Sequence, residues 1–137
     1  MSVADIEILG RMWQELQDRA PGEPLSRELA ERWWDEDVEY IEDPHWPGSG
    51  HYRGLDEVMR AWNGYLEVFE SAEMKLERVF DAGNEAVFFV RVTGISKGAD
   101  VPFDHLWGYV CRVRNGKLAY QRAYWDPQQA LEAAGVS

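Results

Sequence analysis

A carboxylate at a strand end is the first group in this 137-residue sequence that is placed to do proton-transfer chemistry. Asp43 follows the alternating run 39–42 and precedes Pro44, which has no backbone N–H and cannot continue a strand. Because side chains alternate along a strand, Asp43 shares a face with Ile41, and we expect that face to point inward. An apolar cavity raises the pKa of a carboxylate and makes it a stronger base, so Asp43 is the predicted general base. In the alternative interpretation, Asp43 only caps the loop that runs from Pro44 to Pro47.

A long strand predicted for residues 103–114 carries two more groups that could take part in proton transfer, His105 and Tyr109. His105, Tyr109 and Cys111 share one of its faces with large aromatic residues. If that face lines a cavity, His105 is a second acid/base, because imidazole gains and loses protons near neutral pH. Tyr109 would donate a hydrogen bond to the enolate oxygen that forms when a proton leaves a carbon next to a carbonyl. The competing interpretation of His105 is a histidine hydrogen-bonded within the sheet.

Aromatic side chains are frequent enough to build a pocket around these groups. The chain has seven Trp, six Tyr and five Phe, and a flat apolar slot with a few polar groups suits a small hydrophobic or aromatic ligand. Candidates for its walls come from the first helix, the loop after Asp43 and the last two strands. We predict that the ligand contacts Trp13, Trp46, His51, Tyr52, Trp107, Gln121 and Trp125. For Trp13, packing in the core is the competing interpretation.

Composition and charge exclude several other functions. A formal net charge of −11 argues against binding to nucleic acid or to an anionic membrane surface. Cys111 is the single cysteine, which rules out an internal disulfide and a cysteine-built metal site. The three histidines show no metal-ligand spacing, so we expect neither a metal nor a cofactor. Because no apolar segment is long enough to span a membrane, we expect the protein to be cytoplasmic.

The periodicity of the apolar residues predicts a single α+β domain over residues 1–137. Helical spacing dominates the first half of the chain, and a period of two dominates the part after residue 71. The predicted helices cover residues 3–18, 26–34 and 54–69, and a short fourth helix begins at 127. The predicted strands cover 38–43, 72–80, 86–95, 103–114 and 118–125. Residues 35–37 are predicted to form a polar turn, and Asn115–Gly116 the two-residue turn of a hairpin.

The chain resembles the nuclear-transport-factor-2-like superfamily, and within it the SnoaL-like polyketide cyclase and ketosteroid isomerase group. The order of elements matches over essentially the whole chain. Glu42-Asp43-Pro44 resembles the strand-end motif of the isomerases, and the segments 115–118 and 123–125 resemble the last hairpin of the family. The resemblance implies a cone-shaped, curved sheet, mixed but mainly antiparallel, that is wrapped by the N-terminal helices and encloses a pocket. It also implies a homodimer through the outer face of the sheet.

Carried over residue by residue, the resemblance puts Asp43 at the place of the isomerase base. Trp13 and Tyr109 stand where the isomerases have their two oxyanion donors, and His105 resembles the histidine that the cyclases hold near their aspartate. The implied function is cofactor-independent acid/base chemistry, namely isomerisation, cyclisation or dehydration of a hydrophobic carbonyl compound. The alternatives are a module that binds a ligand without turnover and a dimeric interaction domain of the same fold.

Overall fold

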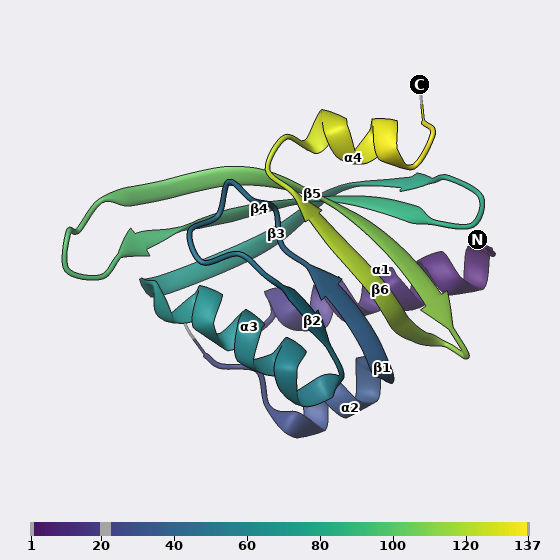
Figure 1. The fold of residues 1–137 in the computed structure, drawn as a ribbon, viewed down its shortest axis with the longest axis horizontal. Coiled ribbons are helices and arrows are strands. Elements are labelled where there is room, and N and C mark those ends of the chain that lie inside the picture. The colour runs from purple at the N-terminus through teal and green to yellow at the C-terminus, as the bar shows by residue number, and fades with distance from the viewer. Residues whose placement is uncertain (1, 20–22, 137) are drawn as a thin grey trace.

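The computed structural model describes residues 2–19 and 23–136, and it has the expected α+β architecture (Figure 1). Most helices come first and most strands follow, in the predicted order except for a short strand at residues 51–53 that was not predicted. The helices are α1 (Val3–Gln17), α2 (Arg27–Trp33), α3 (Leu55–Glu67) and α4 (Pro127–Ala133). The strands are β1 (Trp34–Ile41), β2 (His51–Arg53), β3 (Phe69–Asp81), β4 (Ala86–Ser96), β5 (Pro102–Arg114) and β6 (Lys117–Tyr124).

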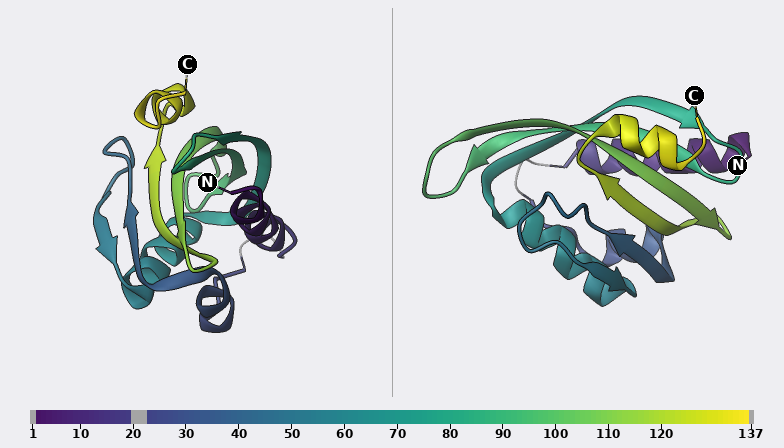
Figure 2. Two further views of the ribbon diagram at one scale, coloured as in Figure 1. Left: turned by 90° about the vertical axis from the view of Figure 1, so that its right-hand side faces the viewer. Right: turned by 45° about the horizontal axis from the view of Figure 1, so that its top comes forward.

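The six strands form one curved sheet in the order β2-β1-β6-β5-β4-β3. The sheet is mixed, because β1 runs parallel to β6 and all other neighbours are antiparallel. The first three helices pack with the inward faces of the strands into the main core, whereas α4 packs on the opposite face (Figure 2). The cone-shaped arrangement that we expected is therefore confirmed. Among the described residues, no helix is long and apolar enough to cross a membrane.

Local sequence signals placed several element boundaries correctly. The Ser26 hydroxyl accepts a hydrogen bond from the backbone N–H of Leu29 and begins α2, and Asp126 does the same for Gln128 at the start of α4. Asn115 and Gly116 have φ values of 52° and 76°, as the predicted hairpin turn requires.

Strand β1 departs from the prediction in two ways. It begins at Trp34, so the expected polar turn at residues 35–37 lies inside a strand whose pairing with β6 is irregular between Trp34 and Glu39. Its inward face carries Val38 and Tyr40, which are buried, while Ile41 is partly exposed. The expectation that the Ile41 face points inward is wrong, because the Tyr40 ring stacks on Trp62 of α3 at 5.5 Å.

The outer face of the sheet is partly covered by α4. A β-carbon on Gly108 of β5 would lie 2.8 Å from both Ala130 Cβ and Pro127 Cα, so only glycine lets α4 approach this closely. Beyond α4, the outer face carries charges such as Arg91, which pairs with carboxylates on β3 and β5. An uncovered apolar face on the sheet would favour a homodimer, but α4 covers much of this surface. The homodimer stays a prediction that rests on the family resemblance.

Candidate active site

Asp43 is buried at the end of β1, and hydrogen bonds occupy both of its carboxylate oxygens. Oδ1 accepts from the backbone N–H of His45 at 2.8 Å and lies 2.9 Å from His45 Nδ1. Oδ2 accepts from the backbone N–H of Trp125 at 2.8 Å. Burial alone would raise the pKa of Asp43, but the hydrogen bonds from His45 and Trp125 together hold it below its usual value. The expected rise in pKa is therefore wrong, and the geometry is that of the capping alternative: Asp43 fastens the loop after β1 to the end of β6.

His105 approaches the same backbone segment from β5. Its Nε2 lies 2.6 Å from the carbonyl oxygen of Trp125, which can only accept, so Nε2 carries a proton and donates this hydrogen bond. The imidazole stacks on the Trp125 ring at 3.6 Å. Asp43 and His105 thus bind the N–H and the C=O of one residue rather than each other. The structure brings these two predicted catalytic residues together, but through the backbone of Trp125.

Tyr109 and Trp13 lie deep in the core. Each is 2% exposed, and their rings are 5.3 Å apart. Burial raises the pKa of Tyr109, so its hydroxyl is neutral at physiological pH. Gln121 is equally buried, and within the described residues neither its Nε2 nor the Trp13 indole nitrogen has a hydrogen-bond partner. For Trp13 the structure agrees with the competing core interpretation.

An open cleft of about 250 Å³ lies between α3 and the loop that joins β1 to β2. Two of the predicted ligand contacts, Trp46 and Tyr52, line it. Its lining residues are Glu42, Trp46, Pro47, Gly48, Tyr52, Arg60, Ala61, Gly64, Tyr65 and Val68. His51 lies outside it, with Nε2 at 2.8 Å from Glu39. The cleft is therefore at the edge of the aromatic core rather than at its centre.

Glu42 is the acidic group of this cleft. The residue is 9% exposed, and Oε1 accepts from the backbone N–H of Gly50 at 3.2 Å. Burial raises the pKa of Glu42 above its usual value, although hydrogen bonds from Gly50 and from the Tyr52 hydroxyl act in the opposite direction. The sequence prediction missed Glu42. The signal was present, because Glu42 continues the alternation of Val38 and Tyr40, which forms the inward face of β1.

Tyr65 of α3 lines the same cleft as Glu42. The indole Nε1 of Trp107 donates a hydrogen bond of 3.0 Å to the Tyr65 oxygen, which leaves the phenolic proton free to be donated elsewhere. Burial raises the pKa of Tyr65, and the negative charge of Glu42 raises it further against the effect of the Trp107 bond. Trp107, a predicted ligand contact, therefore orients a cleft residue and does not line the cleft itself.

The family model of the SnoaL-like domain matches residues 26–121. The chain belongs to the SnoaL-like domain family. This places it in the nuclear-transport-factor-2-like superfamily, as the resemblance implied. A search of curated proteins found no match to this SnoaL-like chain.

Solved structures share the fold of this SnoaL-like chain at low sequence identity. One of them is a putative SnoaL-like polyketide cyclase from a Jannaschia species. It is 16% identical, with a TM-score of 0.74 over 98% of this chain and 93% of that one. A nuclear-transport-factor-2-like protein from Anabaena variabilis is 20% identical, with a TM-score of 0.73 over 92% and 93%. A protein with a ketosteroid isomerase-like fold from Catenulispora acidiphila, in complex with trimethylamine, is 17% identical, with a TM-score of 0.67 over 96% and 94%. At these identities the likeness establishes the fold alone.

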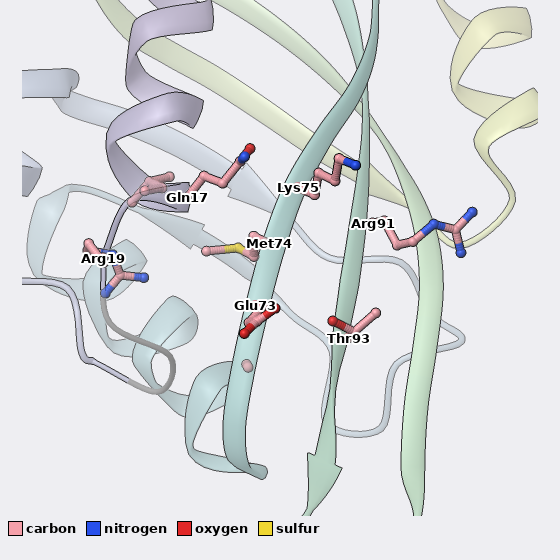
Figure 3. Close-up of a pocket in the computed structure, with 9 residues that line it drawn as sticks. Gln17, Arg19, Glu73, Met74, Lys75, Arg91 and Thr93 are labelled. Carbon is pink, nitrogen blue, oxygen red and sulfur yellow. The ribbon is translucent and has the colours of Figure 1, made fainter.

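A second hollow of this SnoaL-like protein lies at the outer edge of the sheet, where the end of α1 meets β3 and β4 (Figure 3). It measures about 390 Å³ and holds none of the predicted site residues. Arg91 reaches across to Asp104 on β5 at 2.7 Å, away from Arg19 on the α1 side. Among the described residues, no group of three or more His, Cys, Asp or Glu side chains is arranged to hold a metal ion. The cleft with Glu42 therefore remains the best candidate for chemistry.

Proposed function

We propose that this SnoaL-like protein is a small-molecule enzyme that moves a proton on a hydrophobic carbonyl compound bound in the cleft, with Glu42 as the general base. The observation that carries the proposal is the placement of Glu42, a buried carboxylate that opens onto a cleft with aromatic walls. A desolvated carboxylate holds a proton more tightly than a solvated one, and this is what a general base for a weakly acidic C–H bond requires. Isomerisation, cyclisation and dehydration all begin with such a step.

The neighbouring acid is less suited to the role of base. Each oxygen of Asp43 already accepts hydrogen bonds, which stabilise the charged form and lower its affinity for a proton. Asp43 is better described as a positioning residue. It holds His45 and the start of the loop, and the same loop carries Gly50, whose N–H binds Glu42.

The developing oxyanion needs a hydrogen-bond donor, and Tyr65 is the group in position to supply it. Tyr65 lines the cleft, and its oxygen accepts from Trp107, so the phenolic proton is not used in that bond and could be donated to a substrate oxygen. Glu42 and Tyr65 would act together: the carboxylate takes the proton from carbon while the phenol stabilises the enolate. Tyr109, the donor expected from the sequence, is enclosed among core rings.

The test is solvent-deuterium exchange at the carbon next to the carbonyl in a panel of aromatic ketones, followed by proton NMR. The Glu42→Gln variant should catalyse exchange roughly 10²–10⁴-fold more slowly than wild type, the range typical for loss of a general base. Glu36→Gln, which changes an exposed acid on β1, is the matched control and should keep the full rate. If Glu42→Gln exchanges as fast as wild type, the base is another group and the assignment is wrong.

Ligand binding without turnover is the second candidate, and the dense packing of the cone interior favours it. Trp13, Trp62 and Tyr109 are each 2% exposed and pack against one another, so a large substrate could not enter the centre without rearranging them. Binding of the ketones with no exchange above the buffer rate would support this candidate and overturn the enzyme proposal.

A further inference from the structure

Gly64 occupies a position where neither the backbone nor the packing of the protein requires glycine. It lies inside α3, its φ is not in the left-handed region, and a β-carbon built on it would meet no atom within 4 Å. Glycine in a helix interior is less stable than alanine by about 1 kcal/mol. The fold alone would therefore favour a larger residue at this position.

The open space beside Gly64 belongs to the cleft. One face of α3 lines the cleft with Arg60, Ala61, Gly64 and Tyr65, and Val68 follows just after the helix; the two small residues form a low floor in the middle of this face. Trp46 stands across from α3, with its ring 4.7 Å from the Tyr65 ring. A low floor bordered by aromatic rings fits a flat ring system.

Arg60 gives this floor a charged end. It precedes Gly64 by four residues, so the two lie one helical turn apart on the same face. Within residues 2–19 and 23–136, Arg60 forms no ion pair, and Glu42 in the same cleft is not its partner. In a chain with a net charge of −11, an anion needs a local cation to bind, and Arg60 is the basic residue among those that line the cleft.

We propose that the ligand of the cleft is an aromatic carboxylic acid, with its ring over Gly64 and its carboxylate at Arg60. Gly64 and Arg60 are then specificity-determining residues: the first keeps room for the ring, and the second selects the acid over its neutral analogues. The proposal rests on the proposed function only for the location of the site. It narrows the substrate class to aromatic acids that also carry a carbonyl group.

The experiment uses 2-naphthoate and its neutral analogue 2-naphthamide as probes, with dissociation constants from isothermal titration calorimetry. Wild type should bind the acid roughly tenfold more tightly than the amide, as expected for one charge-assisted pair at a partly solvated site. Arg60→Gln should weaken the acid to the level of the amide and leave the amide unchanged.

Two glycine variants separate the floor of the cleft from helix stability. Gly64→Ala and Gly10→Ala should both raise the melting temperature, because both glycines lie inside helices with open space at the β-carbon. Gly64→Leu should weaken both probes at least tenfold, whereas Gly10→Leu in α1 should bind them as wild type does. Circular dichroism confirms that each variant is folded.

Each contrary result overturns a defined part of the proposal. If wild type binds the acid and the amide with equal affinity and Arg60→Gln changes neither, the cleft does not select for a carboxylate. If Gly64→Leu binds both probes as wild type does, the ligand does not lie over Gly64. If wild type binds neither probe, the whole inference is overturned. None of these results decides the role of Glu42, because the deuterium-exchange test uses neutral ketones.

Discussion

Removal of the Asp43 carboxylate should destabilise the protein more than removal of an ordinary surface acid. The carboxylate accepts from two backbone N–H groups, those of His45 and Trp125, and from the His45 ring. Hydrogen bonds to a charged group each contribute about 1.5–3 kcal/mol, and a buried donor that loses its partner keeps its desolvation penalty. The bonds are not additive, so we expect Asp43→Ala to lower the free energy of unfolding by about 3 kcal/mol.

The pH dependence of this loss follows from the direction of the pKa shift. The pKa of Asp43 is lower in the folded protein than in the unfolded chain, so its stabilisation is present above the unfolded value of about 3.9. That stabilisation disappears as the pH falls through the folded pKa. The difference between wild type and Asp43→Ala should therefore be full at pH 7 and shrink below pH 4.

Urea denaturation at pH 7, 5, 4 and 3, followed by tryptophan fluorescence, measures this difference. Asp37→Asn is a suitable control, because Asp37 is an exposed acid on the same strand. It should change the free energy of unfolding by less than about 0.5 kcal/mol. If Asp43→Ala costs no more than this control at pH 7, the three hydrogen bonds do not anchor the loop and the reasoning fails.

Two further variants test the burial of Glu42 and the packing of α4 against the sheet. Because the pKa of Glu42 is raised in the folded protein, the folded state loses stability as the pH rises through that pKa and Glu42 becomes charged. In urea denaturation, Glu42→Gln should therefore be more stable than wild type at pH 8. This gain in stability should vanish near pH 4, where Glu42 is neutral in wild type. Equal stability at both values would show that Glu42 is solvated. Gly108→Ala should lower the free energy of unfolding by about 1–3 kcal/mol, because the new methyl group overlaps Ala130 and Pro127. The same variant should speed amide hydrogen exchange in α4. Unchanged exchange would mean that α4 does not pack as described.

The sequence was sufficient for the elements whose signals are local. Helix α3 carries a long apolar stripe, α2 and α4 begin at capping side chains, and Asn115–Gly116 demands a tight turn. Cys111 is fully buried and packs in the main core as a small apolar side chain. Strand β2 was missed because three residues give no readable period and its pairing with β1 is decided by the fold.

The site was harder to predict because it depends on which face of β1 points inward. Ile41 is more apolar than Tyr40, so the residue types favoured the wrong face. The inward face of β1 is fixed instead by the stacking of Tyr40 on Trp62, a residue of α3 that is distant in the sequence. With the face reversed, Glu42 rather than Asp43 continues the inward side. Asp43 is buried for a different reason, since it lies beyond the last residue of β1 and binds Trp125 N–H at the end of β6.

Two adjacent acids, Asp43 and Glu42, have opposite pKa shifts, and we propose different roles for them. Backbone donors stabilise the charge of Asp43, while burial destabilises that of Glu42, so Asp43 stays ionised and Glu42 holds a proton more readily. Both act on one loop, because Asp43 fixes its start through His45 and Glu42 binds Gly50 near its end. A loosened loop would displace the Gly50 N–H that binds Glu42 but would leave the carboxylate of Glu42, the proposed base, in place. Asp43→Asn should therefore slow deuterium exchange and keep the Glu42 ionisation in the pH profile, shifted upward because the Gly50 bond that lowers the pKa of Glu42 is weakened, whereas Glu42→Gln should abolish that ionisation.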